Sequence, residues 1–114
     1  MLPKVNRLAK NKDFQVAFKK GKGFNEKFVF LKIVKNNFAF SRFGFVVSNR
    51  VSKKSTTRNK IKRQLSHIIY PNLARIKSGY DVIIGVRPEI KNKKYPEIEK
   101  AIKKILLISG LTDD

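Results

Sequence analysis

Between Glu26 and Asp81 the chain has no acidic residue, and a strongly basic segment, residues 50–63, lies near the middle of that interval. Its cations are Arg50, Lys53, Lys54, Arg58, Lys60, Lys62 and Arg63. Toward phosphate, lysine acts as a point charge and arginine as a forked donor. The chain is also 41% hydrophobic, enough to fold. A one-sign field on such a chain indicates a polyanionic partner.

The spacing within this segment predicts a helix that one of the hydroxyls at 55–57 caps and that ends near Ile69. Its apolar stripe repeats at i, i+4, i+7 and i+8: Ile61, Leu65, Ile68 and Ile69. The opposite side is polar and basic: Asn59, Lys60, Arg63, Ser66 and His67. Arg58 and Lys62 flank the stripe. A merely solvated charged face would carry acidic residues for i,i+4 pairing, and this helix carries none, so phosphate binding is favoured.

Aromatic side chains form a second candidate constellation. They lie in a predicted first helix and in two predicted strands: Phe14, Phe18, Phe28, Phe30, Phe43 and Phe45. Basic residues are interleaved with them: Lys19, Lys20, Lys22, Lys32 and Arg42. Most of these rings are expected in the core. An alternative is that a few form an open face on which unpaired bases stack.

Catalysis by the protein alone has little support in the sequence. His67 is the one histidine, there is no cysteine, and the carboxylates are scattered without the pairing that two-metal hydrolysis needs. No glycine-rich phosphate loop is present. The residues therefore describe an RNA-binding accessory with no catalytic residue and no metal site that the sequence identifies.

The remaining segments predict an α+β domain that covers residues 1–114. We expect helices at 12–20 and 95–108, strands at 22–24, 28–34, 43–48 and 80–86, and Asn11 as the cap of the first helix. This order predicts a sandwich with helices packed on a sheet. Net charge is +19, from 27 Lys and Arg against 8 Asp and Glu, which favours nucleic acid over a membrane surface. No apolar run approaches the ~20 residues of a membrane helix.

Two stretches of the sequence resemble the protein component of bacterial ribonuclease P. The first comprises Asn6-Arg7-Leu8, Asp13-Phe14 and Phe18-Lys19-Lys20-Gly21; the second comprises Arg42 to Ser48, Val51 to Lys54 and Arg58-Asn59-Lys60-Ile61-Lys62-Arg63. Residues 80–84 with Arg87-Pro88 match the next strand of that family. The resemblance covers nearly the whole chain in order. It implies an αβββαβα fold on a mixed sheet, similar to ribosomal protein S5 domain 2, with a left-handed β–α–β crossover that runs against the usual hand.

The resemblance also implies a function. The protein would bind ribonuclease P RNA, which itself cleaves precursor tRNA with Mg²⁺ that the RNA mainly holds. It would grip the single-stranded 5′ leader in a cleft between the first helix and the sheet, the leader cleft, with Phe14 and Phe18 on its wall. The residues expected against the catalytic RNA are Arg50, Lys53, Lys54, Arg58, Asn59, Lys60, Lys62, Arg63 and His67. Those expected at the leader are Phe14, Phe18, Lys19, Lys20, Leu31 and Arg87. We expect a cytoplasmic protein with no membrane or DNA partner.

Three positions depart from the family's pattern. Lys60 replaces the usual second arginine of Arg-Asn-Arg, which preserves a phosphate contact but not a bidentate one. Asn49 and Arg50 stand where two lysines are common. Leu31 stands where an aromatic often lines the leader cleft. The alternatives are a ribosomal or other structural RNA-binding protein, a self-sufficient nuclease, and a cationic protein of membrane surfaces.

Overall fold

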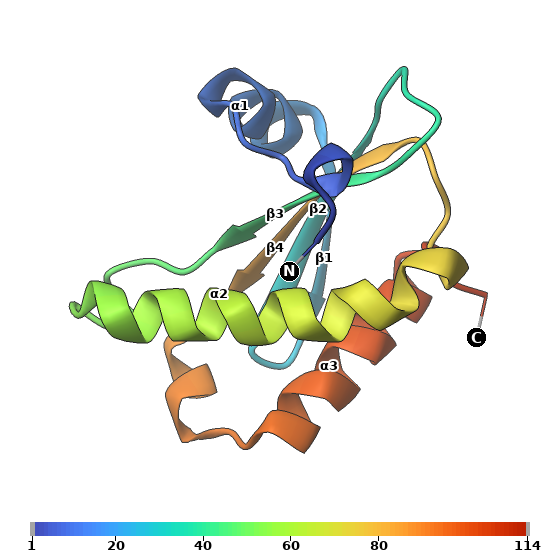
Figure 1. The fold of residues 1–114 in the computed structure, drawn as a ribbon. Coiled ribbons are helices and arrows are strands. Elements are labelled where there is room, and N and C mark those ends of the chain that lie inside the picture. The colour runs from blue at the N-terminus through green and yellow to red at the C-terminus, as the bar shows by residue number, and fades with distance from the viewer. Residues whose placement is uncertain (1, 114) are drawn as a thin grey trace.

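The computed structural model describes residues 2–113 and has the predicted order of helices and strands (Figure 1). Its main elements are α1 (Asn11–Lys20), β1 (Lys22–Glu26), β2 (Val29–Lys35), β3 (Arg42–Val46), α2 (Ser55–Ile69), β4 (Tyr80–Val86) and α3 (Tyr95–Ile108). Three short 3-10 helices are η1 (Lys4–Asn6), η2 (Tyr70–Arg75) and η3 (Pro88–Asn92). The αβββαβα prediction is therefore confirmed.

The four strands form one mixed sheet in the order β1-β2-β4-β3. β2 is antiparallel to both β1 and β4, whereas β3 and β4 are parallel neighbours. The chain passes from β3 to β4 through α2, so α2 is the crossover helix of a strand–helix–strand unit. This connection brings the basic segment beside β3.

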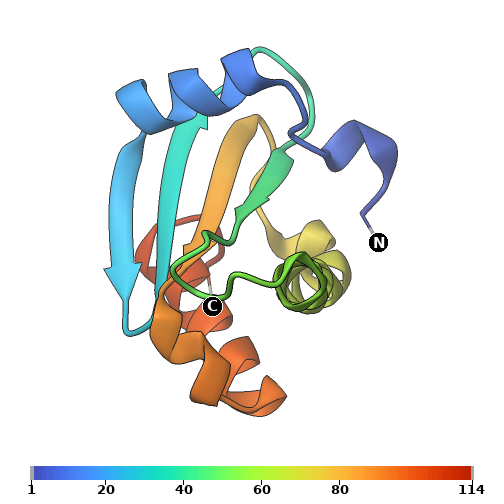
Figure 2. The same cartoon turned by 90° about the vertical axis from the view of Figure 1, so that its left-hand side faces the viewer.

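The helices cover the two faces of the sheet unequally. α2 and α3 belong to a large apolar core that includes Leu31, Phe43, Leu65, Ile84 and Ile105. On the other face, α1 contacts β2 and β4 through a small cluster around Leu8, Ala17 and Ile83. Figure 2 shows α1 lying across one end of the sheet, away from α2 and α3. Much of the α1 face therefore lacks a helix over it.

The predicted helix caps were wrong, and the limits of the first three predicted strands shift: β2 is Val29–Lys35 rather than 28–34, and β3 ends at Val46 rather than at 48. α1 begins at Asn11 after Lys10, and α2 begins at Ser55 after Lys54, with no side-chain cap bond at either residue. Lys10 and Lys54 have extended backbones, so each helix begins after them without a side-chain acceptor for its first N–H groups. β1 extends to Glu26 because it pairs along its whole length with β2, and β3 begins at Arg42, in register with Asp81.

Candidate nucleic-acid interface

The predicted phasing of α2 is confirmed. Its stripe is buried, with Leu65, Ile68 and Ile69 fully so. Its polar side is exposed at Asn59, Lys60, Arg63 and His67. The preceding loop exposes Arg50, Lys53 and Lys54 as well. α2 therefore presents its basic residues to solvent over its length.

The cations of residues 50–63 make few contacts with the rest of the protein. Arg58 is half-buried and donates to the carbonyl of Ser52 at 2.9 Å, which fastens the loop before α2 to its first turn. The ion pairs within residues 2–113 involve Arg42, Lys77 and Lys104, none of them in the basic segment. The positive field of α2 is thus uncompensated by the protein's own carboxylates, as a phosphate-binding surface requires.

A hollow of about 440 Å³ lies between α2, β3 and the N-terminal segment. Its apolar lining is Leu2, Leu8, Ala9, Phe14, Phe43, Gly44 and Phe45. Its polar lining is Arg7, Lys62, Arg63, Ser66 and His67. The structure therefore brings one predicted leader residue, Phe14, and three predicted RNA-binding residues of α2 around a single space, which an aromatic ring and cationic side chains line together.

Gly44 sets the position of Phe14 in this hollow. A Cβ atom at position 44 would lie less than 3.0 Å from ring atoms of Phe14. Any side chain there would displace the ring, because it could not share that volume. The glycine of the Arg42–Ser48 motif therefore lets the α1 ring lie directly on β3.

The other predicted leader residues are divided between the two ends of the sheet. Phe18, which is 40% exposed, shares α1 with Phe14, and Lys19 and Lys20 are exposed on the last turn of that helix. Arg87 follows β4 at the far end. Its Nη1 donates to the carbonyls of Val29 and Lys27 at 3.0 and 3.2 Å, and its Nη2 donates to Asn25 Oδ1. Arg87 thus fastens the β1–β2 hairpin, and the structure does not bring it to the hollow.

Leu31 lies on the wrong face for a leader contact. Its side chain is 1% exposed and packs in the core under α2 and α3. Because side chains alternate along a strand, the neighbouring Phe30 and Lys32 point to the α1 face instead. Both are half-buried. The structure therefore contradicts the expectation that Leu31 lines the leader cleft, because its side chain is buried on the opposite face of β2.

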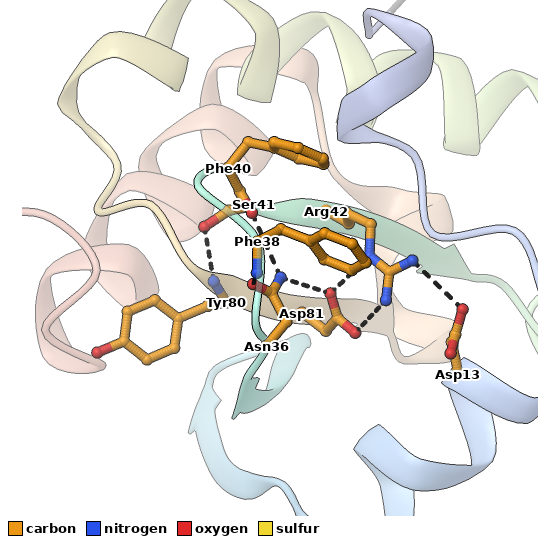
Figure 3. A network of polar contacts seen from close by, with 8 residues as sticks. All are labelled: Asp13, Asn36, Phe38, Phe40, Ser41, Arg42, Tyr80 and Asp81. Carbon is orange, nitrogen blue, oxygen red and sulfur yellow. Dashed lines mark hydrogen bonds and ion pairs between the residues drawn. The ribbon is translucent and has the colours of Figure 1, made fainter.

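An ion-pair network anchors the first turn of α1 to the sheet (Figure 3). Arg42 donates from Nε and Nη2 to the two carboxylate oxygens of Asp81, at 2.8 and 2.6 Å, and from Nη1 to Asp13 at 3.3 Å. Asn36 donates to the same Asp81 carboxylate at 2.9 Å. The centroid of the Phe38 ring lies 4.7 Å from the guanidinium carbon of Arg42. The hydrogen bonds that Arg42 donates to Asp81 are the main cause that raises the pKa of Arg42.

The sequence did not predict this network, which corrects the expectation about Arg42. Arg42 belonged to the cations interleaved with aromatics, but its donors serve Asp13 and Asp81 rather than a ligand. Asp13 immediately precedes Phe14, so the ion pair also limits where the Phe14 ring can lie. Asp81, an acid in an otherwise apolar strand, was the available signal, because a buried carboxylate needs a partner.

The metal-ligating side chain types of the described residues are dispersed. Within 2–113 there is no group of three His, Cys, Asp or Glu side chains that could hold a metal ion. The carboxylates of Asp13 and Asp81 serve the network around Arg42. In the same part of the chain, no helix has the length and apolar character to cross a membrane.

Comparison with known proteins gives one consistent family. Residues 2–109 match the family described as Ribonuclease P. The ribonuclease P protein component of Alkaliphilus metalliredigens is 37% identical, over 91% of this chain and 96% of the relative. That of Alkaliphilus oremlandii is 39% identical, over 90% and 89%. The structure of a Staphylococcus aureus RNase P protein mutant superposes with a TM-score of 0.88 at 27% identity, covering 95% of this chain and 91% of that one.

Proposed function

Because the chain belongs to the ribonuclease P protein component family, we propose that it is the subunit that holds both the catalytic RNA and the 5′ leader of precursor tRNA. In this proposal the exposed side of α2 lies against the catalytic RNA. The uncompensated cations of residues 50–63 support that assignment, since neutralising phosphates is the main source of RNA affinity.

The observation that carries the proposal is the hollow between Phe14 and α2. A single strand needs aromatic rings for its bases and cations for its phosphates. The hollow supplies Phe14 on one side and Lys62 and Arg63 on the other. Phe18, Lys19 and Lys20 continue the same pattern along α1. The leader would therefore lie between α1 and the sheet, with the hollow at one end of its path.

The protein's part in the reaction is binding and orientation. The RNA would supply the catalytic site and hold most of the Mg²⁺ that hydrolysis uses. Fixed lysine and arginine side chains would lower the repulsion between the catalytic RNA and its substrate, so fewer metal ions are needed to bring the two together. The complex would act in the cytoplasm on precursor tRNA.

Reconstitution tests this proposal. The purified chain should cleave nothing alone and should stimulate cleavage of precursor tRNA by ribonuclease P RNA at low Mg²⁺. No stimulation would refute it. If ribosomal RNA dominated the RNA that co-purifies with the chain, a structural role in another ribonucleoprotein would replace it. Activity that survives removal of RNA and is lost with a carboxylate substitution would indicate a nuclease, and tight anionic-lipid binding without RNA preference would indicate a membrane-surface protein.

A further inference from the structure

The exposed side of α2 continues beyond His67, the last residue expected to contact the catalytic RNA. Its polar row is spaced i, i+4, i+7 and i+11, and so follows one line of the helix: Asn59, Arg63, Ser66 and Tyr70. Tyr70 has helical backbone angles, and its N–H donates to the carbonyl of Ser66. The rise of an α-helix places it about 10 Å beyond Arg63 along the axis. An aromatic side chain therefore ends the polar row of α2.

Tyr70 is the most exposed aromatic residue of 2–113, with 51% of its surface accessible. Within those residues, neither a cation nor another ring lies over it, and its hydroxyl makes no hydrogen bond. The rings of the described chain that are engaged in this way are Phe24, Phe28, Phe30, Phe38 and Phe40. The Tyr70 ring is therefore open to a ligand, on a surface that is otherwise polar and basic.

The junction between α2 and η2 fixes the backbone that carries Tyr70 (Figure 1). Pro71 follows directly and restricts the chain there. Asn72 is buried, and its Nδ2 donates to the carbonyl of Ile68 at 2.7 Å. Its Oδ1 accepts a hydrogen bond of 3.0 Å from Nη2 of Arg75. Because these contacts exist before a ligand binds, less conformational entropy is lost when the ring makes a contact.

The ring lies outside the hollow that we assign to the leader. The side chains of α2 that line the hollow are Lys62, Arg63, Ser66 and His67. Tyr70 follows them by about one turn toward η2. The ligand expected at Tyr70 is thus the catalytic RNA that lies along α2. Cations bind the phosphates of paired and unpaired RNA alike, whereas an aromatic ring stacks on a base whose face is free.

We propose that Tyr70 stacks on an unpaired base of the catalytic RNA, at the end of the phosphate-binding row of α2. The inference rests on the proposed function and adds to it a contact that depends on the structure of the RNA. The cations of α2 can bind many stretches of phosphate backbone, but a ring at a set distance from them requires an unpaired base at that distance. Tyr70 would thereby fix the register of α2 on the RNA.

The affinity of the full chain for ribonuclease P RNA tests this contact. Tyr70→Leu should lower the affinity about tenfold, as the loss of one base–aromatic stack implies. The log–log slope of affinity against salt should stay the same, because no charge is removed. Tyr70→Phe keeps the ring and should keep most of the affinity. Tyr95→Leu is the matched control, since Tyr95 is 39% exposed at the start of α3, and it should bind as the wild type does.

Directed cleavage locates the base. The chain has no cysteine, so Tyr70→Cys supplies a single thiol for an iron chelate that cleaves nearby RNA. Cleavage should centre on an unpaired segment of the catalytic RNA, and the same reagent on Tyr95→Cys should not cleave there. Cleavage confined to paired helices, or to precursor tRNA when that is added, would overturn the inference.

The remaining outcomes separate this inference from the proposed function. If the wild-type protein stimulates cleavage of precursor tRNA while Tyr70→Leu binds the catalytic RNA with unchanged affinity, the inference is overturned and the proposed function stands. An equal loss in Tyr70→Phe, or a Tyr70→Leu protein that unfolds at lower urea than the wild type, also overturns it, because the hydroxyl or internal packing would then explain the effect. If the wild-type protein neither binds the RNA nor stimulates cleavage, both are refuted.

Discussion

The two faces of the sheet are built for different purposes. The face under α2 and α3 is a continuous apolar core, with Leu31, Val82 and Ile84 at or below 1% exposure. The α1 face buries only Leu8, Ala17 and Ile83 as a separate cluster and leaves Phe18 40% exposed. Stability therefore resides mainly on the first face, and the second keeps rings and cations accessible to a ligand.

The second face compensates for its small core with directed contacts. The Arg42 ion pairs hold the start of α1, and Gly44 and Gly85 determine where two aromatic rings lie. A surface arranged in this way can stay open without losing its geometry. The comparison predicts that substitutions on the two faces separate stability from leader recognition.

Leu31→Ala should give the largest effect on stability. It removes a fully buried side chain from the core, and we expect a loss of about 2–5 kcal/mol in the free energy of unfolding, measured with urea. Leu107→Ala, on an exposed position of α3, is the matched control and should change little. If Leu31→Ala left stability intact but reduced precursor binding selectively, the assignment of its face would be wrong.

Asp81→Asn should give the next largest effect on stability. We expect a loss of about 2 kcal/mol in the free energy of unfolding, because the substitution leaves Arg42 without its main carboxylate. Asp113→Asn, which breaks the exposed pair with Lys77, should cost little. The raised pKa of Arg42 belongs to a cation, so the stability it contributes is complete at neutral pH and is lost only as strong alkali deprotonates it. If the free energy of unfolding of the wild-type protein fell near neutral pH because Arg42 lost its proton there, this expectation would be contradicted.

The double substitution Lys60→Ala with Arg63→Ala tests the cationic side of α2. Affinity for the catalytic RNA should fall about 30-fold, as the loss of two charged phosphate contacts implies. The log–log slope of affinity against salt should become shallower by roughly 1.4–1.8. Lys91→Ala with Lys100→Ala removes the same charge from exposed positions elsewhere. Equal losses in the two proteins would mean that total charge, rather than α2, determines RNA affinity.

The sequence predicted the parts of this structure that depend on local pattern. The burial of Ile61 and Leu65 follows from helical spacing, and the order of elements follows from their boundaries. The face of β2 could not be assigned by alternation alone, because FVFLKIV has apolar residues on both faces. A slip of one residue then exchanges the faces. Lys32 was the usable signal, since a charge marks the less buried face.

The contacts that shape the site are long-range. Arg42 and Asp81 are 39 residues apart, and only the parallel pairing of β3 with β4 makes them neighbours. The antiparallel pairing of β2 with β4 places Phe30 on Gly85. Such contacts follow from the topology of the sheet and have no local signature, so the sequence predicts a ligand class for the surface but not its internal supports.

The most direct test of the account is the ratio of affinities for precursor and mature tRNA in Phe18→Ala. The ring is exposed on α1, so its removal should leave unfolding nearly unchanged. It should lower the affinity of the complex for precursor tRNA about tenfold, within the range of base–aromatic stacking, and leave mature tRNA binding as it was. An equal loss for both RNAs, or destabilisation of the fold without a change in the ratio, would contradict the claim that the α1 face recognises the leader.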